Sequence, residues 1–248
     1  MPVGIIYCNS GLAAAEAVAD FAVAMIISTF RHLPWLMTAA ASNNPATFLD
    51  CHGRATAQSH TLRGRVLGLI GLGNIGQQIA ARCSAGFRMD IHYFDVERKS
   101  SQMELDLKAT FHTTLESLLG AADCVVLCTP AGGKVVTKES MAWFKPGSRF
   151  VNIARGSLVD EEALVDGLVQ GTLSAVALDV HENEPNLHPK LIEMAGTKAM
   201  LTCHNAGGTV ETHVGFEELS MRNIMAVLAG GKAITPVNLH YLPKVTRE

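Results

Sequence analysis

The sequence predicts an α/β protein whose core is a doubly wound parallel sheet. Between residues 65 and 208, short apolar runs alternate with segments of helical periodicity, which is the order that parallel strands with crossover helices require. The apolar runs are continuous, so each strand should be covered on both faces. Of the 248 residues, 48 % are hydrophobic and 17 % charged, which suits a sizeable core. The predicted strands are 66–70, 91–94, 124–128, 149–153, 173–178 and 199–202, with helices near 74–85, 113–120, 137–144 and 160–170.

The two ends of the chain flank this pattern. An apolar run at 3–8 predicts a strand, and residues 12–41 predict a long Ala-rich helix. Its most apolar part, 18–30, contains Asp20 and is shorter than the roughly 20 apolar residues of a membrane span, so we expect a buried helix. Polar and turn-forming residues predict a loop or linker over 42–60. A last helix is expected over 211–228, before Gly230 and Gly231.

Charge and cysteine usage exclude several classes of function. The formal net charge is −3 and the Lys and Arg residues are not clustered, which argues against a nucleic-acid surface. The six cysteines include no Cys-x-x-Cys pair, so we expect free thiols and a cytoplasmic protein. No basic segment precedes the first apolar run, so no signal peptide is expected. The histidines have no metal-ligand spacing, so no metal site is expected.

A glycine-rich loop after the first strand of the pattern predicts a dinucleotide site. The loop reads Gly71-Leu72-Gly73-Asn74-Ile75-Gly76. Gly71 would allow the tight turn, Gly73 the approach of a pyrophosphate, and Gly76 close packing of helix on strand. The following helix would offer its N-terminal N–H groups to the phosphates. Asp95, at the end of the next strand, would accept hydrogen bonds from the adenosine ribose, which favours NAD over NADP. Nearby Arg98 and Lys99 are the features that would favour NADP, and a plain glycine turn with a solvated acid is the alternative.

Three polar segments follow the last three predicted strands. Arg155 follows 149–153, Asp179 and Glu184 follow 173–178, and His204 follows 199–202. Ligands of such sheets bind outside the carboxyl ends of the strands, so these side chains are expected in one crevice. A guanidinium can hold a carboxylate, and a histidine beside a carboxylate is an acid/base pair. Each of these side chains, taken singly, could have an ordinary structural role. Their expected position at one edge of the sheet favours an active site.

These segments resemble the signature segments of the D-2-hydroxyacid dehydrogenases, in order and spacing, from about residue 3 to residue 238. Within that family the chain looks most similar to D-mandelate dehydrogenases and glyoxylate or hydroxypyruvate reductases. The resemblance implies that Arg155 binds the carboxylate of a 2-oxo acid, that His204 exchanges a proton with its carbonyl oxygen, and that Glu184 orients His204.

The same resemblance implies further contacts with the cofactor. Asp179 would hold the nicotinamide carboxamide, Thr129 and Pro130 would line the adenine side, and Ala154 would also contact the cofactor. Two positions depart from the family pattern: His181 stands where phenylalanine is usual, and Cys203 where proline is usual. Glu184 replaces the glutamine of the related formate dehydrogenases, which argues against formate as substrate.

The resemblance also predicts a domain organisation. Residues 1–10 would be a remnant strand of a flavodoxin-like substrate domain. Residues 11–208 would form the Rossmann-like NAD-binding domain, with 11–60 as a helical arm and linker, and 209–248 would return toward the substrate domain. Most of the substrate domain, including a Gly-rich loop that grips the substrate, is not expected in this chain. We therefore expect NAD binding with weak turnover.

The expected partners follow from the same comparison. They are a small 2-oxo or 2-hydroxy acid and a second copy of the chain, joined through the Ala-rich helix near 12–30. No nucleic acid or membrane partner is expected. Two alternatives remain: a non-catalytic NAD-binding fragment, and an NAD-sensing binding protein that resembles the C-terminal-binding-protein corepressors.

Overall fold

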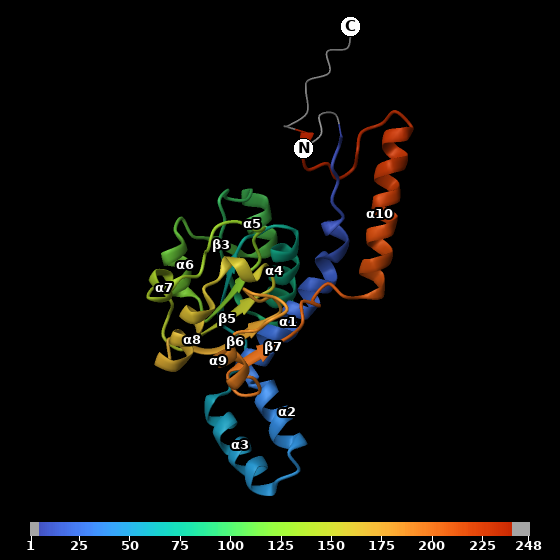
Figure 1. Cartoon of the computed structure of the whole chain (residues 1–248). Coiled ribbons are helices and arrows are strands. Elements are labelled where there is room, and N and C mark those ends of the chain that lie inside the picture. The colour runs from blue at the N-terminus through green and yellow to red at the C-terminus, as the bar shows by residue number, and fades with distance from the viewer. Residues whose placement is uncertain (1–4, 240–248) are drawn as a thin grey trace. The chain divides into compact units, whose positions relative to one another are not determined.

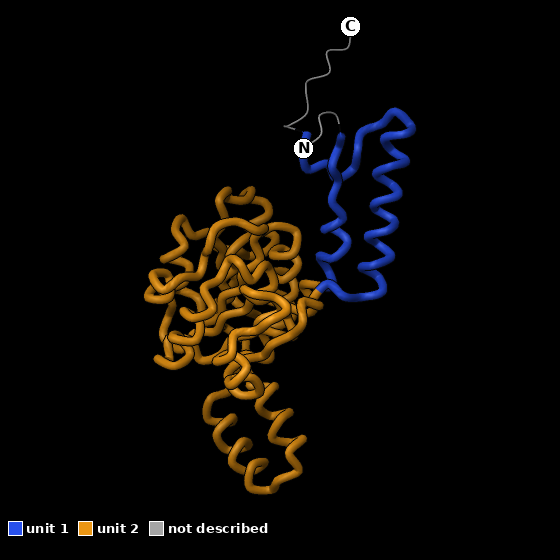
Figure 2. Tube along the Cα trace, viewed as in Figure 1, with its two compact units in different colours: residues 1–17, 207–248 blue, residues 18–206 orange. Residues whose placement is uncertain are grey.

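The computed structural model describes residues 5–239. It divides into two compact units, of which unit 1 comprises Met1–Ala17 with Gly207–Glu248 and unit 2 comprises Val18–Ala206 (Figure 2). Unit 2 holds the sheet and every predicted site residue. The assignment of the terminal segments to a substrate domain stays a prediction.

A seven-stranded sheet in the order β3-β2-β1-β4-β5-β6-β7 forms the centre of unit 2, and every neighbouring pair is parallel (Figure 1). The strands are β1 Val66–Ile70, β2 Asp90–Phe94, β3 Ala109–Phe111, β4 Cys124–Leu127, β5 Ser148–Asn152, β6 Leu173–Leu178 and β7 Ala199–Leu201. The predicted fold class is confirmed. The sequence pattern missed β3, which has three residues and no full apolar run. The strand order reverses between β1 and β4, where open α/β sheets bind ligands.

Helices connect the strands. They are α4 Asn74–Phe87, α5 Ser101–Leu107, α6 Leu115–Ala121, α7 Lys138–Met141, α8 Glu161–Gln170 and α9 Pro189–Glu193. The four predicted helices correspond to α4, α6, α7 and α8, whereas α5 and α9 were not predicted. Polar side chains start four of them: Ser100, Thr114, Thr137 and Asp160 each accept a hydrogen bond from a backbone N–H in the first turn.

Three helices precede the sheet: α1 Ala15–Arg31, α2 Leu33–Ala41 and α3 Pro45–Gln58. The predicted loop over 42–60 is wrong, because most of it is α3. The Asn44 side chain caps α3, since it accepts hydrogen bonds from the N–H groups of Ala46 and Thr47, and Pro45 occupies the first turn. The two residues that suggested a loop therefore begin a helix. The predicted single helix over 12–41 is interrupted at His32, whose φ is +51°.

The apolar side chains of α1 lie in the core of unit 2. Ala19, Ala22, Met25 and Ile26 have no exposed surface, which confirms the prediction of a buried helix over 18–30. Among the described residues, 11–31 is the one segment that is long and apolar enough to cross a membrane by length and composition alone. Phe21, Val23 and Ile27 remain partly exposed, and the expected contact of residues 12–30 with a second copy of the chain stays a prediction.

Unit 1 is organised around α10, Val210–Leu228, close to the predicted last helix. The buried Asn223 joins it to the C-terminal segment, since its Oδ1 accepts from the N–H groups of Ile234 and Thr235 at 2.9 and 3.0 Å. The predicted strand over 3–8 is not formed by the described residues 5–8. Cys8 makes an isolated antiparallel bridge to Pro236, so this segment has a neighbour that the sequence did not predict.

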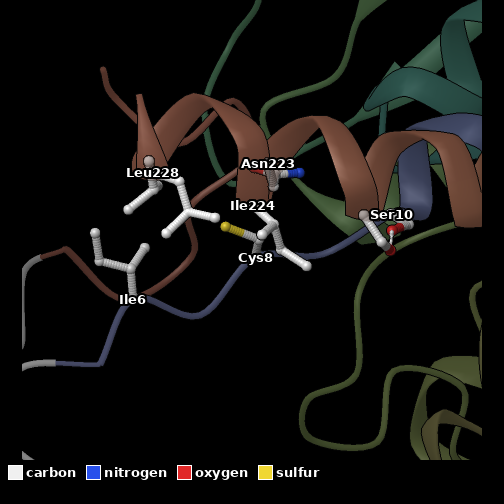
Figure 3. A pocket seen from close by; sticks show the side chains of 8 residues that line it. Ile6, Cys8, Ser10, Asn223, Ile224 and Leu228 are labelled. Carbon is white, nitrogen blue, oxygen red and sulfur yellow. Dashed lines mark hydrogen bonds between the residues drawn. The ribbon is translucent and has the colours of Figure 1, made fainter. Parts of the chain in front are cut away.

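A pocket of about 440 Å³ lies within unit 1 (Figure 3). Its labelled lining residues are Ile6, Cys8, Ser10, Asn223, Ile224 and Leu228. The lining is mainly apolar and contains no acid/base pair, whereas all the predicted catalytic residues lie in unit 2.

Candidate active site

The glycine-rich loop joins β1 to α4. Gly71 has a φ of +99°, a conformation that side chains rarely adopt, so the tight turn requires glycine. A Cβ on Gly76 would lie 2.5 Å from the carbonyl oxygen of Gly71, which explains the close packing of helix on strand. A Cβ on Gly73 would meet nothing within 4 Å, and no side chain caps α4. The loop therefore leaves the helix N-terminus open to an anion.

Asp95 follows β2 and faces this loop. Its Oδ2 accepts from the Leu72 N–H at 2.9 Å and pairs with the Lys99 ammonium at 2.9 Å. Burial raises the pKa of Asp95, but the Leu72 N–H and Lys99 outweigh it and hold that pKa below its usual range. Arg98 is engaged elsewhere, in a two-point contact with Glu104 at 2.9 Å for each bond. The two basic residues that the sequence left ambiguous are thus both paired with acids.

Thr129 and Pro130 follow β4, the strand beside β1. The Thr129 hydroxyl oxygen is buried and has no hydrogen-bond partner among the described residues. The preceding thiol, Cys128, donates to the carbonyl of Gly71 at 3.0 Å, which ties the two loops together. An orphaned buried hydroxyl beside the glycine-rich loop fits a site that a polar ligand completes.

Arg155 follows β5 and is exposed. The Asn152 side chain fixes its turn, accepting from the Ala154 N–H at 3.0 Å and donating to the Arg155 carbonyl at 3.1 Å. Within the described part of the chain, the guanidinium donates only to the carbonyl of Ala154, at 2.6 Å. The cation is therefore presented at the edge of the sheet without a carboxylate partner.

Asp179, directly after β6, is 1 % exposed and acts as an anchor for the segment after β7. Its Oδ1 accepts from the Thr202 hydroxyl at 2.7 Å and from the Asn205 N–H at 2.9 Å. Its Oδ2 accepts from the Ala206 N–H at 2.8 Å, and its carbonyl accepts from the His204 N–H at 2.7 Å. This set of bonds holds His204 in a left-handed conformation, with φ +54°.

Glu184 and His204 are in direct contact. His204 Nδ1 lies 2.9 Å from Glu184 Oε2, and Glu184 Oε1 accepts from the His181 N–H at 2.8 Å. Burial raises the pKa of Glu184, but the hydrogen bonds from His204 and His181 hold it below its usual range. An ionised carboxylate only accepts, so Nδ1 carries the proton of this bond and Nε2 is left for exchange with a ligand.

The predicted catalytic residues thus lie in the segments that follow three neighbouring strands, β5, β6 and β7. Glu184 and His204 are brought together, while Arg155 makes no contact with either and shares only their edge of the sheet. Asn152 and Thr202, which fix the two turns, were not predicted as site residues, although each polar side chain stands within three positions of a predicted catalytic residue. No group of three metal-ligating side chains occurs within residues 5–239.

Comparisons with known proteins identify the family of the chain. The family model of the NAD-binding domain of D-isomer specific 2-hydroxyacid dehydrogenases matches residues 23–206. The chain belongs to this family. The holo form of D-mandelate dehydrogenase from Rhodotorula graminis superimposes with a TM-score of 0.91 at 36 % identity, covering 94 % of this chain and 68 % of that chain.

Two further relatives of the 2-hydroxyacid dehydrogenase family are similar. The glyoxylate reductase of Pyrococcus furiosus is 33 % identical over 248 residues, which cover 95 % of this chain and 69 % of the relative. An NADPH-dependent glyoxylate/hydroxypyruvate reductase of Sinorhizobium meliloti, solved with NADP and malonate, is 31 % identical with a TM-score of 0.79, covering 94 % of this chain and 70 % of that chain. The predicted enzyme class, an oxidoreductase of 2-hydroxyacids with a nicotinamide cofactor, is confirmed.

Proposed function

We propose that this chain interconverts a small 2-oxo acid and its 2-hydroxy acid, with Arg155 binding the carboxylate and His204 exchanging the proton. The observation that carries the proposal is the 2.9 Å contact between His204 Nδ1 and Glu184 Oε2, at the same sheet edge as the glycine-rich loop. Glu184 orients the imidazole and stabilises its cation. His204 Nε2 then gives a proton to the carbonyl oxygen on reduction and removes it on oxidation.

The residues on the other half of the sheet edge fit a dinucleotide. The open N-terminus of α4 with Gly71, Gly73, Asn74, Ile75 and Gly76 would hold the pyrophosphate. Thr129, whose hydroxyl lacks a partner, and Pro130 would line the adenine side, and Ala154 would border the nicotinamide. The contact of Asp179 with the carboxamide would use Oδ2, which accepts one hydrogen bond from the described residues. When bound, the cofactor supplies or accepts the hydride.

NAD is the cofactor that the ribose side favours. Asp95 is held ionised beside the loop, and a carboxylate there repels a 2′-phosphate. Arg98 is committed to Glu104 through two bonds and Lys99 to Asp95 through one, so neither cation is free to bind that phosphate without breaking an ion pair.

A homodimer is proposed, for which the α2–α3 hairpin offers an apolar surface in addition to residues 12–30. Met37, Phe48 and Leu49 on this hairpin are 69 %, 54 % and 67 % exposed. We expect Phe48→Ser with Leu49→Ser to turn a sedimenting dimer into a monomer, while Leu105→Ser, equally exposed on α5, leaves it unchanged. A wild-type monomer at micromolar concentration would contradict the dimer. The described thiols are free, which supports a cytoplasmic location.

The deciding experiment follows the absorbance of NADH with the purified chain and a panel of 2-oxo acids. We expect oxidation that depends on the acid and is lost in Arg155→Ala and His204→Ala. Arg63→Ala and His52→Ala are the controls, since both residues are exposed and lie outside the strand-end loops. Unchanged turnover in His204→Ala would overturn the assignment. No turnover in the wild type, with NADH binding kept in fluorescence, would leave a cofactor-binding protein only.

A further inference from the structure

His181, one of the two departures from the family pattern, is buried under the candidate active site. Its side chain is 2 % exposed, and Nε2 lies 2.8 Å from the carbonyl oxygen of Thr202. A carbonyl only accepts hydrogen bonds, so Nε2 carries a proton. The imidazole thereby holds the chain two residues before His204.

The other ring nitrogen faces a buried acid. His181 Nδ1 lies 3.7 Å from Oε1 of Glu161, the first residue of α8, whose side chain is 4 % exposed. A neutral imidazole with its proton on Nε2 would turn the Nδ1 lone pair toward this carboxylate, whereas the imidazolium turns a proton toward it. Burial lowers the pKa of His181, but Glu161 and the Thr202 carbonyl outweigh it and raise that pKa above its usual range.

The backbone of His181 reaches the remaining parts of the site. Its N–H donates to Glu184 Oε1, the carboxylate that contacts His204. A Cβ on Gly156 would overlap the carbonyl group of His181, so the turn that presents Arg155 rests directly on this peptide. One residue thus contacts the supports of all three predicted catalytic side chains.

We propose that His181 is a positioning residue, and that its buried ion pair with Glu161 holds the Glu184–His204 contact and the Arg155 turn in register. The inference rests on the proposed function, because it names what fixes the geometry of that site. The proposal implies that the site needs a proton on the His181 imidazole to keep its catalytic side chains aligned. This proton is separate from the one that His204 exchanges with the substrate.

The pair predicts a pH window. The charged groups that act on the imidazole are Glu161 from α8 and Glu184 from its own loop, whereas the neighbouring Glu182 is paired with Lys134. The raised pKa of His181 means that the pair is intact at low pH and is lost as the pH rises through that value. Burial raises the pKa of Glu161, but His181 outweighs it and holds it low, so the carboxylate is lost only in acid. Alignment is therefore kept between these two values.

The first test compares His181→Phe and Glu161→Gln with the wild type. We expect kcat to fall about 10-fold to 100-fold with little change in KM, as a misplaced acid/base group predicts, and the alkaline fall attributed to His181 to disappear. The matched controls are His188→Phe and Glu162→Gln, because that histidine–glutamate pair joins the same loop to α8 at 3.0 Å but is more exposed. Unchanged kcat and pH profile in His181→Phe would overturn the proposal.

A second test does not depend on turnover. We expect imidazole ¹⁵N shifts to show that the His181 cation persists to a higher pH in the wild type than in Glu161→Gln, because the buried carboxylate is then absent. We also expect the amides of Asn205 and Ala206 to exchange faster in His181→Phe. Titration of His181 at the same pH in the two proteins, or unchanged exchange, would overturn the inference. Absent turnover together with a charged, protecting His181 would instead count against the proposed function alone.

Discussion

The two halves of the sheet edge are built differently. After β1, β2 and β4, the site is made mostly of backbone: a glycine with positive φ, an open helix N-terminus and one carboxylate. After β5, β6 and β7, it is made of side-chain bonds between segments far apart in the chain, such as Glu184 to His204 and Asp179 to Thr202. The first half depends on local conformation, and the second depends on the register of neighbouring strands. The two should therefore fail independently.

The largest difference between the effect on turnover and the effect on cofactor binding should come from His204→Ala. We expect turnover to fall by about 10²-fold to 10⁴-fold, the usual contribution of a positioned acid/base group. The affinity for NADH, measured by fluorescence titration, should stay within a factor of about two, because the glycine-rich loop is untouched. A parallel loss of NADH affinity would show that the two halves form one unit.

The converse change is Gly76→Ala. The added Cβ would lie 2.5 Å from the Gly71 carbonyl, so we expect a loss of about 1–3 kcal/mol in unfolding free energy and weaker NADH binding. Gly86→Ala is the control, since it lies in the same helix with nothing within 4 Å of its Cβ. Denaturant unfolding and fluorescence titration measure both effects. Equal stability of the two variants would contradict the close packing.

Asp95→Ala tests the ribose side alone. Removing the carboxylate also releases Lys99, so we expect the ratio of KM for NADPH to KM for NADH to fall by about 10-fold, which corresponds to one modest interaction. Steady-state kinetics with each cofactor measure the ratio, and Asp90→Ala, an exposed acid on the same strand, should leave it unchanged. An unchanged ratio in Asp95→Ala would remove the argument for NAD.

The smallest effect concerns Glu184 and acid. Its pKa is lowered in the folded chain, so its contribution is complete above the ordinary glutamate value of about 4.3 and is lost as the pH falls below it. The pair is half-exposed, so the contribution should be at most about 1 kcal/mol. We expect Glu184→Gln to unfold more easily than the wild type at neutral pH, and this difference to shrink as the pH falls below about 4.3, while Glu193→Gln shows no difference at either pH. A gap that grows in acid would have the wrong sign.

The same contrast explains which features the sequence predicted. The glycine-rich loop and Asp95 are visible because turn geometry and helix starts act over a few residues. The loop prediction over 42–60 failed on a local ambiguity, since Asn44 and Pro45 favour both turns and helix starts. Strand β3 was missed because the polar Thr110 interrupts its three residues, so that no apolar run marks it, whereas the equally short β7 is apolar throughout.

For the segments after β5, β6 and β7, the sequence predicted the catalytic residues but not the hydrogen bonds that hold them in place. His204 and Glu184 were paired through the family resemblance, and the structure shows the contact. The roles of Asn152, Thr202 and Glu161 depend on the register of β5, β6 and β7, which no local pattern encodes. The burial of His181 was equally out of reach, because a lone histidine in a polar loop is normally exposed.

Gly156 and Arg155 are adjacent, yet the two positions should differ in how many substitutions they tolerate. At 156 any β-carbon overlaps the His181 carbonyl, so selection for soluble protein alone should already leave glycine as the one tolerated residue. At 155 the side chain is exposed, so nearly every substitution should survive that selection and only a demand for turnover should restore arginine. A library randomised at both positions would thus distinguish a residue that folding requires from a neighbouring residue that only turnover requires.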